Sequence, residues 1–212
     1  GANVVVSSRK ADVCDAVAAE INEKWADRGG SATAIPCHIG HKDQLQALVD
    51  QTQDKLGPID ILVPNAAVNP YYGPSADMPD SAWDKIMETN VRSTFWLCNM
   101  VIPGMAERGK GAVTIIASIS GLKAAVELFA YSVSTVGEHQ RARNLAAEYG
   151  PKGVRVNAIA PGLIKTDFAK ALWTDPVRLE QINNRMPLRR LGDPDEVAGA
   201  AMFLSSKAGA YM

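Results

Sequence analysis

The sequence has little cysteine, little histidine and no long apolar run. No CxxC or HExxH pattern links its three cysteines and three histidines, which are Cys14, Cys37, Cys98, His38, His41 and His139. This spacing argues against a zinc site or a disulfide framework and favours a reducing compartment. We therefore expect no metal and a cytoplasmic location. No stretch of eighteen apolar residues occurs, so we expect no membrane span.

The chain also lacks an excess of charge of either sign. It has 22 Lys and Arg residues against 23 Asp and Glu residues, with 47% hydrophobic and 21% charged residues among 212. This composition is typical of a globular protein and predicts a single domain over residues 1–212. The balance gives no reason to expect a nucleic-acid or anionic-membrane partner.

Short β-branched runs alternate with longer runs of helical periodicity. We expect strands at 3–8, 32–37, 60–63, 112–117 and 154–159. Helices are expected at 12–28, 43–56, 79–107, 131–149, 166–185 and 194–205, with the third split near Pro103-Gly104. This alternation predicts an α/β fold with a doubly wound parallel sheet covered on both faces.

A set of motifs gives the clearest indication of function. Ser118 precedes Tyr131 by thirteen residues, Asn90 lies in a long predicted helix, and the runs PNAA (64–67) and RVNAIAPGLIKT (155–166) flank them. Together these resemble the short-chain dehydrogenase/reductase family, which has a Rossmann-like fold. The resemblance implies an active site of Asn, Ser, Tyr and Lys. Asn90, Ser118 and Tyr131 match the first three, but Thr135 stands where the lysine belongs.

The chemistry expected of Tyr131 explains why the lysine matters. A carbonyl reduction needs a proton at the oxygen, and an ordinary tyrosine, with a pKa of about 10, exchanges it poorly near neutrality. A cation about 5 Å away would lower that pKa by roughly 2 units. Thr135 has no charge, and Lys123 and Lys165 are the nearest substitutes by sequence. We therefore expect reduced or absent activity in this chain.

The resemblance assigns roles to the other two residues. Ser118, with Ser120 as a weaker candidate, would bind the substrate oxygen and orient it against Tyr131. In the family the counterpart of Asn90 breaks its helix locally and holds a water that relays protons to the lysine. An asparagine inside a helix is locally unfavourable unless its amide has a task.

The cofactor expected is NADP(H). Basic and hydroxyl groups follow the first predicted strand, at Ser8, Arg9 and Lys10, where an NAD-preferring site would carry an acid. A solvated basic turn is the alternative interpretation. By resemblance, further cofactor contacts are His38, Ile39, Asn65, Ala66, Ala67, Tyr131, Pro161, Gly162, Ile164 and Thr166.

Two segments of the family pattern are missing. The glycine-rich turn that holds the pyrophosphate at a helix N-terminus is not found, since Gly29-Gly30 lies between a helix and a strand. By comparison with the family, about thirty residues are absent before Gly1, and the last strand is absent after Tyr211. We therefore expect a Rossmann-like sheet without its first βα unit and last strand, with two unpaired inner edges.

The resemblance also suggests a substrate class and an assembly. The runs NAAVNP and APGLIKT, with Leu172-Trp173, match a subgroup similar to NADP-dependent retinol dehydrogenase/reductases. The apolar stretch of about 163–186 matches a substrate lid and suits a small hydrophobic carbonyl or alcohol. The family commonly forms tetramers, which implies a homo-oligomer (tetramer or dimer) through helices at about 80–101 and 131–149. A C-terminal signal in a longer chain would make the location peroxisomal. The alternative function is an impaired pseudoenzyme or scaffold.

Overall fold

The fold is a Rossmann-like α/β arrangement of parallel strands flanked by helices. The computed structural model describes residues 1–212, apart from the side chain of Ala26. The strands are β1 (Asn3–Val6), β2 (Ser31–Ala34), β3 (Ile61–Leu62), β4 (Gly111–Ile116) and β5 (Val154–Ile159). The α-helices are α1 (Ala11–Trp25), α2 (Lys42–Leu56), α3 (Asp80–Ile86), α4 (Ser93–Glu107), α5 (Phe129–Tyr149), α6 (Lys170–Trp173), α7 (Pro176–Arg185) and α8 (Pro194–Ser205).

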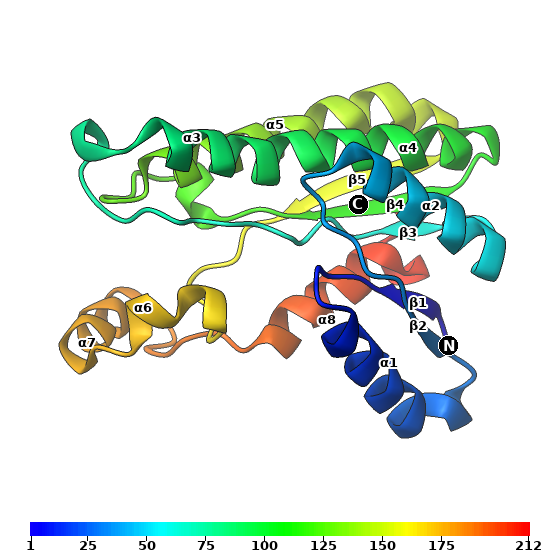
Figure 1. The fold of residues 1–212 in the computed structure, drawn as a ribbon, viewed down its shortest axis with the longest axis horizontal. Helices are drawn as coiled ribbons and strands as arrows, with labels where there is room; N and C mark the ends of the chain where they lie inside the picture. Colours follow the sequence, from blue (N-terminus) through cyan, green and yellow to red (C-terminus); the bar gives the residue numbers. More distant parts are fainter.

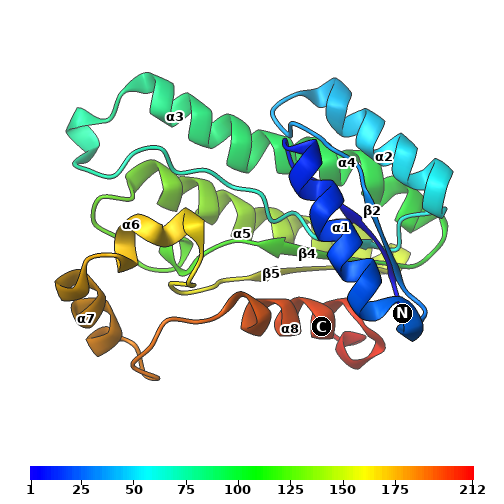
Figure 2. The same ribbon diagram turned by 60° about the horizontal axis from the view of Figure 1, so that its bottom comes forward.

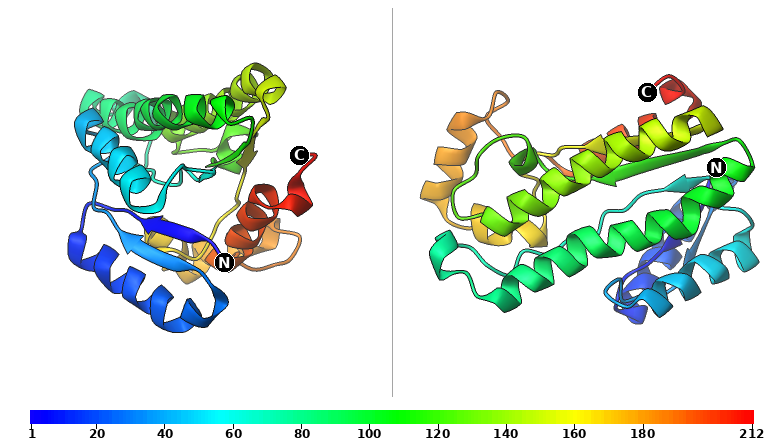
Figure 3. Two further views of the ribbon diagram at one scale, coloured as in Figure 1. Left: turned by 90° about the vertical axis from the view of Figure 1, so that its right-hand side faces the viewer. Right: turned by 90° about the horizontal axis from the view of Figure 1, so that it is seen from above.

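The strands form two separate parallel sheets. β1 pairs with β2, and β4 lies between β3 and β5 in a second sheet. Figure 1 and the left view of Figure 3 show the β1–β2 pair apart from the larger sheet. The prediction of two unpaired inner edges is confirmed, because β1 and β3 each have one partner strand among the described residues. Val4, Ile61 and Val63 at these edges are more than a third exposed.

Helices cover both faces of the three-stranded sheet. α4 and α5 lie side by side on one face, and α8 packs against β4 and β5 from the other (Figures 1 and 2). Below the β1–β2 pair lies α1. The doubly wound arrangement predicted from the alternation of strands and helices is therefore present.

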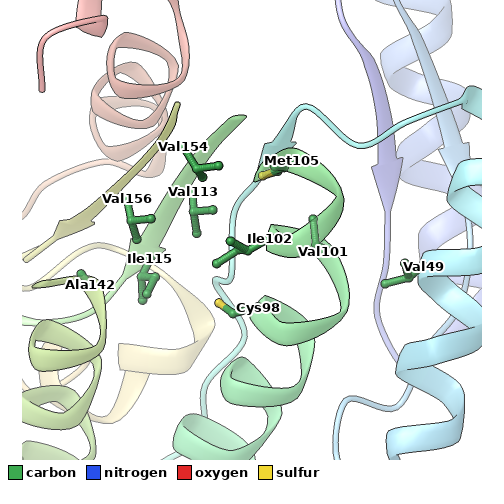
Figure 4. Packing of buried hydrophobic residues seen from close by; sticks show 10 residues of the cluster. All are labelled: Val49, Cys98, Val101, Ile102, Met105, Val113, Ile115, Ala142, Val154 and Val156. Atoms are coloured by element: carbon green, nitrogen blue, oxygen red, sulfur yellow. The ribbon is translucent and has the colours of Figure 1, made fainter. Parts of the chain in front are cut away.

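The main core lies between α4, α5 and the larger sheet. Ile102 and Met105 of α4 face Val113 and Ile115 of β4, and Val154 and Val156 of β5 extend the same layer (Figure 4). Because these strands are buried on both faces, their sequences are continuous apolar runs and do not alternate between apolar and polar residues. Val49 links α2 to this core.

The predicted split of the long helix near Pro103-Gly104 is wrong. α4 continues through Pro103, and the interruption lies earlier, in a π-helical turn, η3 (Met87–Arg92), that contains Asn90. A proline removes one N–H from a helix and leaves the carbonyl four residues before it unpaired. Here Pro103 and Asn99 both lie on the exposed face, so water can satisfy that carbonyl.

Several predicted bounds also shift. The strands expected at 3–8 and 32–37 are shorter, and the run at 166–185 divides into the short helix η6 (Asp167–Ala169), α6 and α7. Beyond β1, Ser8 still accepts a backbone hydrogen bond from Cys37, so the chain stays extended there without a regular strand.

Other short helical turns are η1 (Ala26–Arg28), η2 (Ser75–Asp77), η4 (Ile119–Gly121), η5 (Gly150–Lys152) and η7 (Lys207–Gly209).

Candidate active site

One large cavity opens at the carboxyl ends of β3, β4 and β5. It encloses about 1410 Å³, and its wall is mainly apolar. Ligand sites in open α/β sheets lie outside the carboxyl ends of the strands. The cavity also extends along the open edges of the sheets to Val4 and Ile61. Among the described residues, no helix is long and apolar enough to cross a membrane.

Ser118 and Tyr131 share the wall of this cavity. Ser118 follows β4, and Tyr131 lies in the first turn of α5. Burial raises the pKa of Tyr131 above its usual value, a hydrogen bond with Ser118 lowers it, and the nearby Tyr72 raises it. The ring of Phe168 lies 5.9 Å from the Tyr131 ring and brings the lid segment over it. A tyrosine with a raised pKa keeps its proton at neutral pH.

The loop after β4 is held by a short hydrogen-bond chain. Ser118 Oγ accepts from the Ser120 N–H at 3.1 Å and from Ser120 Oγ at 2.9 Å. His139 Nε2 lies 2.9 Å from the main-chain oxygen of Ser118. Ser120 also lines the cavity, so both predicted hydroxyl candidates lie at the site. This contact of His139 could not be predicted from the sequence, because a lone histidine in a helix has many possible roles.

Thr135 does not replace the lysine chemically. It is buried, and its hydroxyl donates to the Ser132 carbonyl at 3.0 Å and lies 3.4 Å from Ser120 Oγ. Thr135 is not part of the cavity wall. No cation contributes to the pKa of Tyr131 in the described chain. Of the two substitutes named from sequence, Lys123 lines the cavity and Lys165 does not.

Asn90 joins two walls of the site. Its Oδ1 accepts from the Val68 N–H at 2.8 Å, and its Nδ2 donates to the Val68 carbonyl at 3.0 Å and to Ser134 Oγ at 3.1 Å. Ser134 Oγ donates in turn to the Tyr131 carbonyl at 2.8 Å. These bonds satisfy the amide of Asn90 inside its helix, while its expected role in holding a water stays a prediction.

The expected cofactor residues fall into two neighbouring groups. One group lines the cavity and comprises Asn65, Ala66, Ala67, Tyr131, Pro161, Gly162, Ile164 and Thr166. The other comprises Ser8, Arg9, Lys10, His38 and Ile39, after β1 and β2 and outside the cavity wall. The Cys37 N–H to Ser8 carbonyl bond, at 3.0 Å, holds the two parts of this second group side by side.

The second group has the charge expected for a phosphate site. Arg9 and Lys10 are exposed, and neither takes part in an ion pair in the structure as described. Ser8 Oγ accepts from the Lys10 N–H at 3.3 Å, which orders the turn. His38 is fixed by its own N–H, which donates to Gln44 Oε1 at 2.8 Å. We find no cluster of three or more His, Cys, Asp or Glu side chains that could hold a metal ion among the described residues.

The segment predicted as a lid covers one side of the cavity. Phe168, Leu172, Ile182 and Met186 line it, while Trp173 Nε1 donates to the Thr166 carbonyl at 3.1 Å. Arg178 of α7 pairs with Glu127, which precedes α5, at 3.0 Å. Asn69 was missed from sequence: it lines the cavity, and both polar atoms of its side chain are buried without a partner among the described residues.

Comparisons with known proteins agree with this arrangement. Residues 1–212 match the family model described as Enoyl-(Acyl carrier protein) reductase. A relative named dehydrogenase/reductase SDR family member 4, from Bos taurus, is 40% identical over all of this chain and 75% of its own length. A 7α-hydroxysteroid dehydrogenase, solved with NADH and 7-oxo glycochenodeoxycholic acid, is 37% identical with a TM-score of 0.89, covering 100% of this chain and 80% of that one.

A second solved structure resembles the fold even more closely at lower identity. The gluconate 5-dehydrogenase of Burkholderia cenocepacia, solved with NADP and tartrate, is 26% identical with a TM-score of 0.91 over 100% of this chain and 81% of that one. The fold, the motifs and the matches over the whole of this chain lead to one conclusion. The chain belongs to the short-chain dehydrogenase/reductase family of oxidoreductases.

Proposed function

We propose that this chain is an NADP(H)-dependent oxidoreductase that interconverts a carbonyl compound and its alcohol, with Tyr131 as general acid and base. The observation that carries the proposal is the shared position of Ser118 and Tyr131 on the wall of one apolar cavity at the carboxyl ends of β3–β5. A hydroxyl that orients a carbonyl oxygen next to a proton donor is the arrangement that such a reaction needs.

The residues present fit the two ends of a nicotinamide dinucleotide, although the glycine-rich turn for its pyrophosphate is not among them. The cavity of about 1410 Å³ combines the space at the carboxyl ends of the strands with the open sheet edges at Val4 and Ile61. Arg9 and Lys10, exposed and without ion pairs among the described residues, suit a 2′-phosphate, and Pro161 to Thr166 would hold the nicotinamide half. When bound, the cofactor supplies or accepts a hydride. One solved relative holds NADP and another holds NADH, so the relatives do not decide between the two cofactors. The main support for NADP(H) is therefore the basic turn at Arg9 and Lys10.

The proton chemistry favours carbonyl reduction. Ser118 would donate a hydrogen bond to the substrate oxygen, and Tyr131 would deliver its proton to that oxygen. Since burial raises the pKa of Tyr131, its phenol stays protonated near neutrality, so it holds the proton for reduction but is a weaker acid than an ordinary tyrosine. The reverse reaction needs the phenolate, which this environment disfavours. Asn90 would fix the position of the loop that contains Val68 relative to the helix that carries Tyr131.

The cavity wall supports an apolar substrate. Lid residues Phe168, Leu172 and Ile182 face the cavity, and the unpartnered amide of Asn69 offers one polar contact. This combination suits a hydrophobic ketone or aldehyde with one additional polar group. We further propose a cytoplasmic homo-oligomer, with peroxisomal location as the alternative. Exposed Phe95, Phe129 and Val136 on α4 and α5 support the self-association, which light scattering after size exclusion would test.

A second candidate function is cofactor binding without turnover. Thr135 favours it, since its hydroxyl bonds to its own helix and no cation reaches Tyr131 within the described residues. One experiment decides between the two. NADPH binding and NADPH oxidation with a panel of apolar ketones are measured for the full chain and for Tyr131→Phe. Turnover that Tyr131→Phe removes supports the enzyme; binding without turnover in either protein supports the second candidate.

A further inference from the structure

Three successive carbonyls of the π-helical turn η3 each receive a side-chain donor. Ser93 Oγ donates to the Thr89 carbonyl at 2.5 Å, and Thr94 Oγ1 donates to the Asn90 carbonyl at 3.1 Å. Arg141 Nη2 donates to the Val91 carbonyl at 2.8 Å. Serine and threonine often bond back to a carbonyl four residues earlier in their own helix. Arg141 differs because it comes from α5, fifty residues away in sequence.

Arg141 is itself held in place on α5. Its Nε lies 3.2 and 3.3 Å from the two carboxylate oxygens of Glu138, and the two side chains are 14% and 5% exposed. The ring of Phe95 lies 5.8 Å from the guanidinium carbon. A charge-assisted bond from a fixed guanidinium is stronger and more directional than a bond between neutral groups. The Glu138–Arg141 pair therefore clamps α5 to the widened turn of the neighbouring helix.

The clamped turn carries Asn90. A π-helical turn is wider than an α-helical one and often marks a functional position. In η3 it directs the Asn90 amide to both the N–H and the carbonyl of Val68 and to Ser134 beside Tyr131. The Val91 carbonyl is the next one along from Asn90. A shift of this turn would therefore move the loop that lines the cavity relative to Tyr131.

We propose that Arg141, held by Glu138, is a positioning residue that fixes the turn of Asn90 and so keeps the Val68 loop and Tyr131 in register. The catalytic consequence of this clamp depends on the proposed function, whereas its structural part does not. No carboxylate–guanidinium pair is needed merely to fill this space, since buried pairs are often replaced by apolar side chains without loss of stability.

The test is hydrogen exchange of single amides, measured by NMR on the full chain. The Val68 N–H is the probe because it donates to Asn90 Oδ1. In Arg141→Met we expect the Val68 amide to exchange roughly tenfold faster or more, while Val113 and Val156 of the central sheet stay as in the wild type. Arg143→Met is the matched control, because Arg143 is exposed on the same helix and bonds only Gln140 among the described residues.

A double variant removes the effect of an unpaired buried charge. Arg141→Met alone leaves Glu138 buried without its partner, which could unfold the chain. Glu138→Leu with Arg141→Met carries no such charge, and the clamp predicts fast exchange at Val68 there too. The proposal is overturned if the double variant restores slow exchange at Val68. It is also overturned if Val113 and Val156 accelerate as much as Val68, since the pair would then support the whole domain.

Turnover separates the clamp from the proposed function. If the enzyme is active, we expect Arg141→Met to lower kcat more than it raises the KM for cofactor, and Arg141→Lys to recover part of the loss. Tyr131→Phe should abolish turnover while leaving Val68 exchange unchanged. If no variant has activity, the exchange data still decide the structural claim, and the failure falls on the proposed function alone.

Discussion

The hydroxyl of Thr135 donates its hydrogen bond to the carbonyl of Ser132, 3.0 Å away in its own helix. It is therefore turned away from Tyr131, one helical turn earlier, and brings that phenol neither charge nor a hydrogen bond. Burial consequently dominates the Tyr131 pKa and raises it. A single side chain thus separates this site from one in which the phenol exchanges its proton readily near neutrality.

Restoring the charge should restore proton transfer. We expect Thr135→Lys to lower the pKa of Tyr131 and to raise kcat with an apolar ketone by roughly 10- to 100-fold, in line with one nearby charge. NADPH oxidation across pH 5 to 10 measures both effects. Thr135→Met is the control, because it adds similar length without charge. Equal rates for the two variants would show that the missing cation is not the limiting defect.

The alternation of strands and helices predicted the α/β fold, whereas the roles expected of the site residues stay predictions. Ser118 and Tyr131 lie where their motif indicated, because both follow strand and helix signals that are strong locally. The resemblance implied a local break of the helix at Asn90, and the structure has a π-helical turn there. The contacts that Ser93, Thr94 and Arg141 make with this turn could not be predicted, because these residues lie on two different helices. Pro103, a strong local breaker, does not end its helix because the Asn99 carbonyl that it leaves unpaired lies on the exposed face, where water can satisfy it.

Cofactor preference should depend on the turn after β1. Arg9 is exposed and makes no ion pair within the described structure, so its guanidinium is available for a 2′-phosphate. We expect Arg9→Gln to weaken NADPH binding about tenfold while changing NADH binding little. Fluorescence titration with both cofactors gives the ratio. Arg28→Gln serves as the control, because Arg28 is exposed but stacks on Trp25. An equal loss for both cofactors would contradict a 2′-phosphate role.

The ion pair between Arg178 and Glu127 should affect the lid more than the fold. The two groups lie 3.0 Å apart, and both side chains are more than 40% exposed. Exposed pairs contribute about 0.2–1 kcal/mol, so Arg178→Ala should change the free energy of unfolding by less than about 1 kcal/mol. We expect the KM for a ketone to rise a few-fold as the lid opens more often. Lys170→Ala is the control, because Lys170 is exposed on α6 and does not line the cavity. Arg185→Ala is unsuitable, because Arg185 lines the cavity. An unchanged KM would show that the ion pair between Arg178 and Glu127 does not hold the lid closed.

Glu138 should make stability fall as pH rises. Burial raises the pKa of Glu138 from 4.5 to about 7, and the nearby Arg141 acts in the opposite direction and lowers it. The other titratable group that interacts with Glu138 is the thiol of Cys98 in α4. The pKa of Cys98 is raised to about 12, so that thiol stays neutral. Because the folded pKa lies above the unfolded one, the contribution is complete below about pH 4.5 and is lost as pH rises to about 7.

The comparison with Glu138→Gln isolates this effect from the histidines. Between pH 4.5 and 8 the wild type should lose up to about 3 kcal/mol relative to the variant, from 1.36 kcal/mol per pKa unit. Urea unfolding of both proteins at several pH values in this window measures the difference. If the wild type instead gains stability with rising pH, Arg141 keeps Glu138 ionised throughout, and the attraction between the two outweighs the cost of burial.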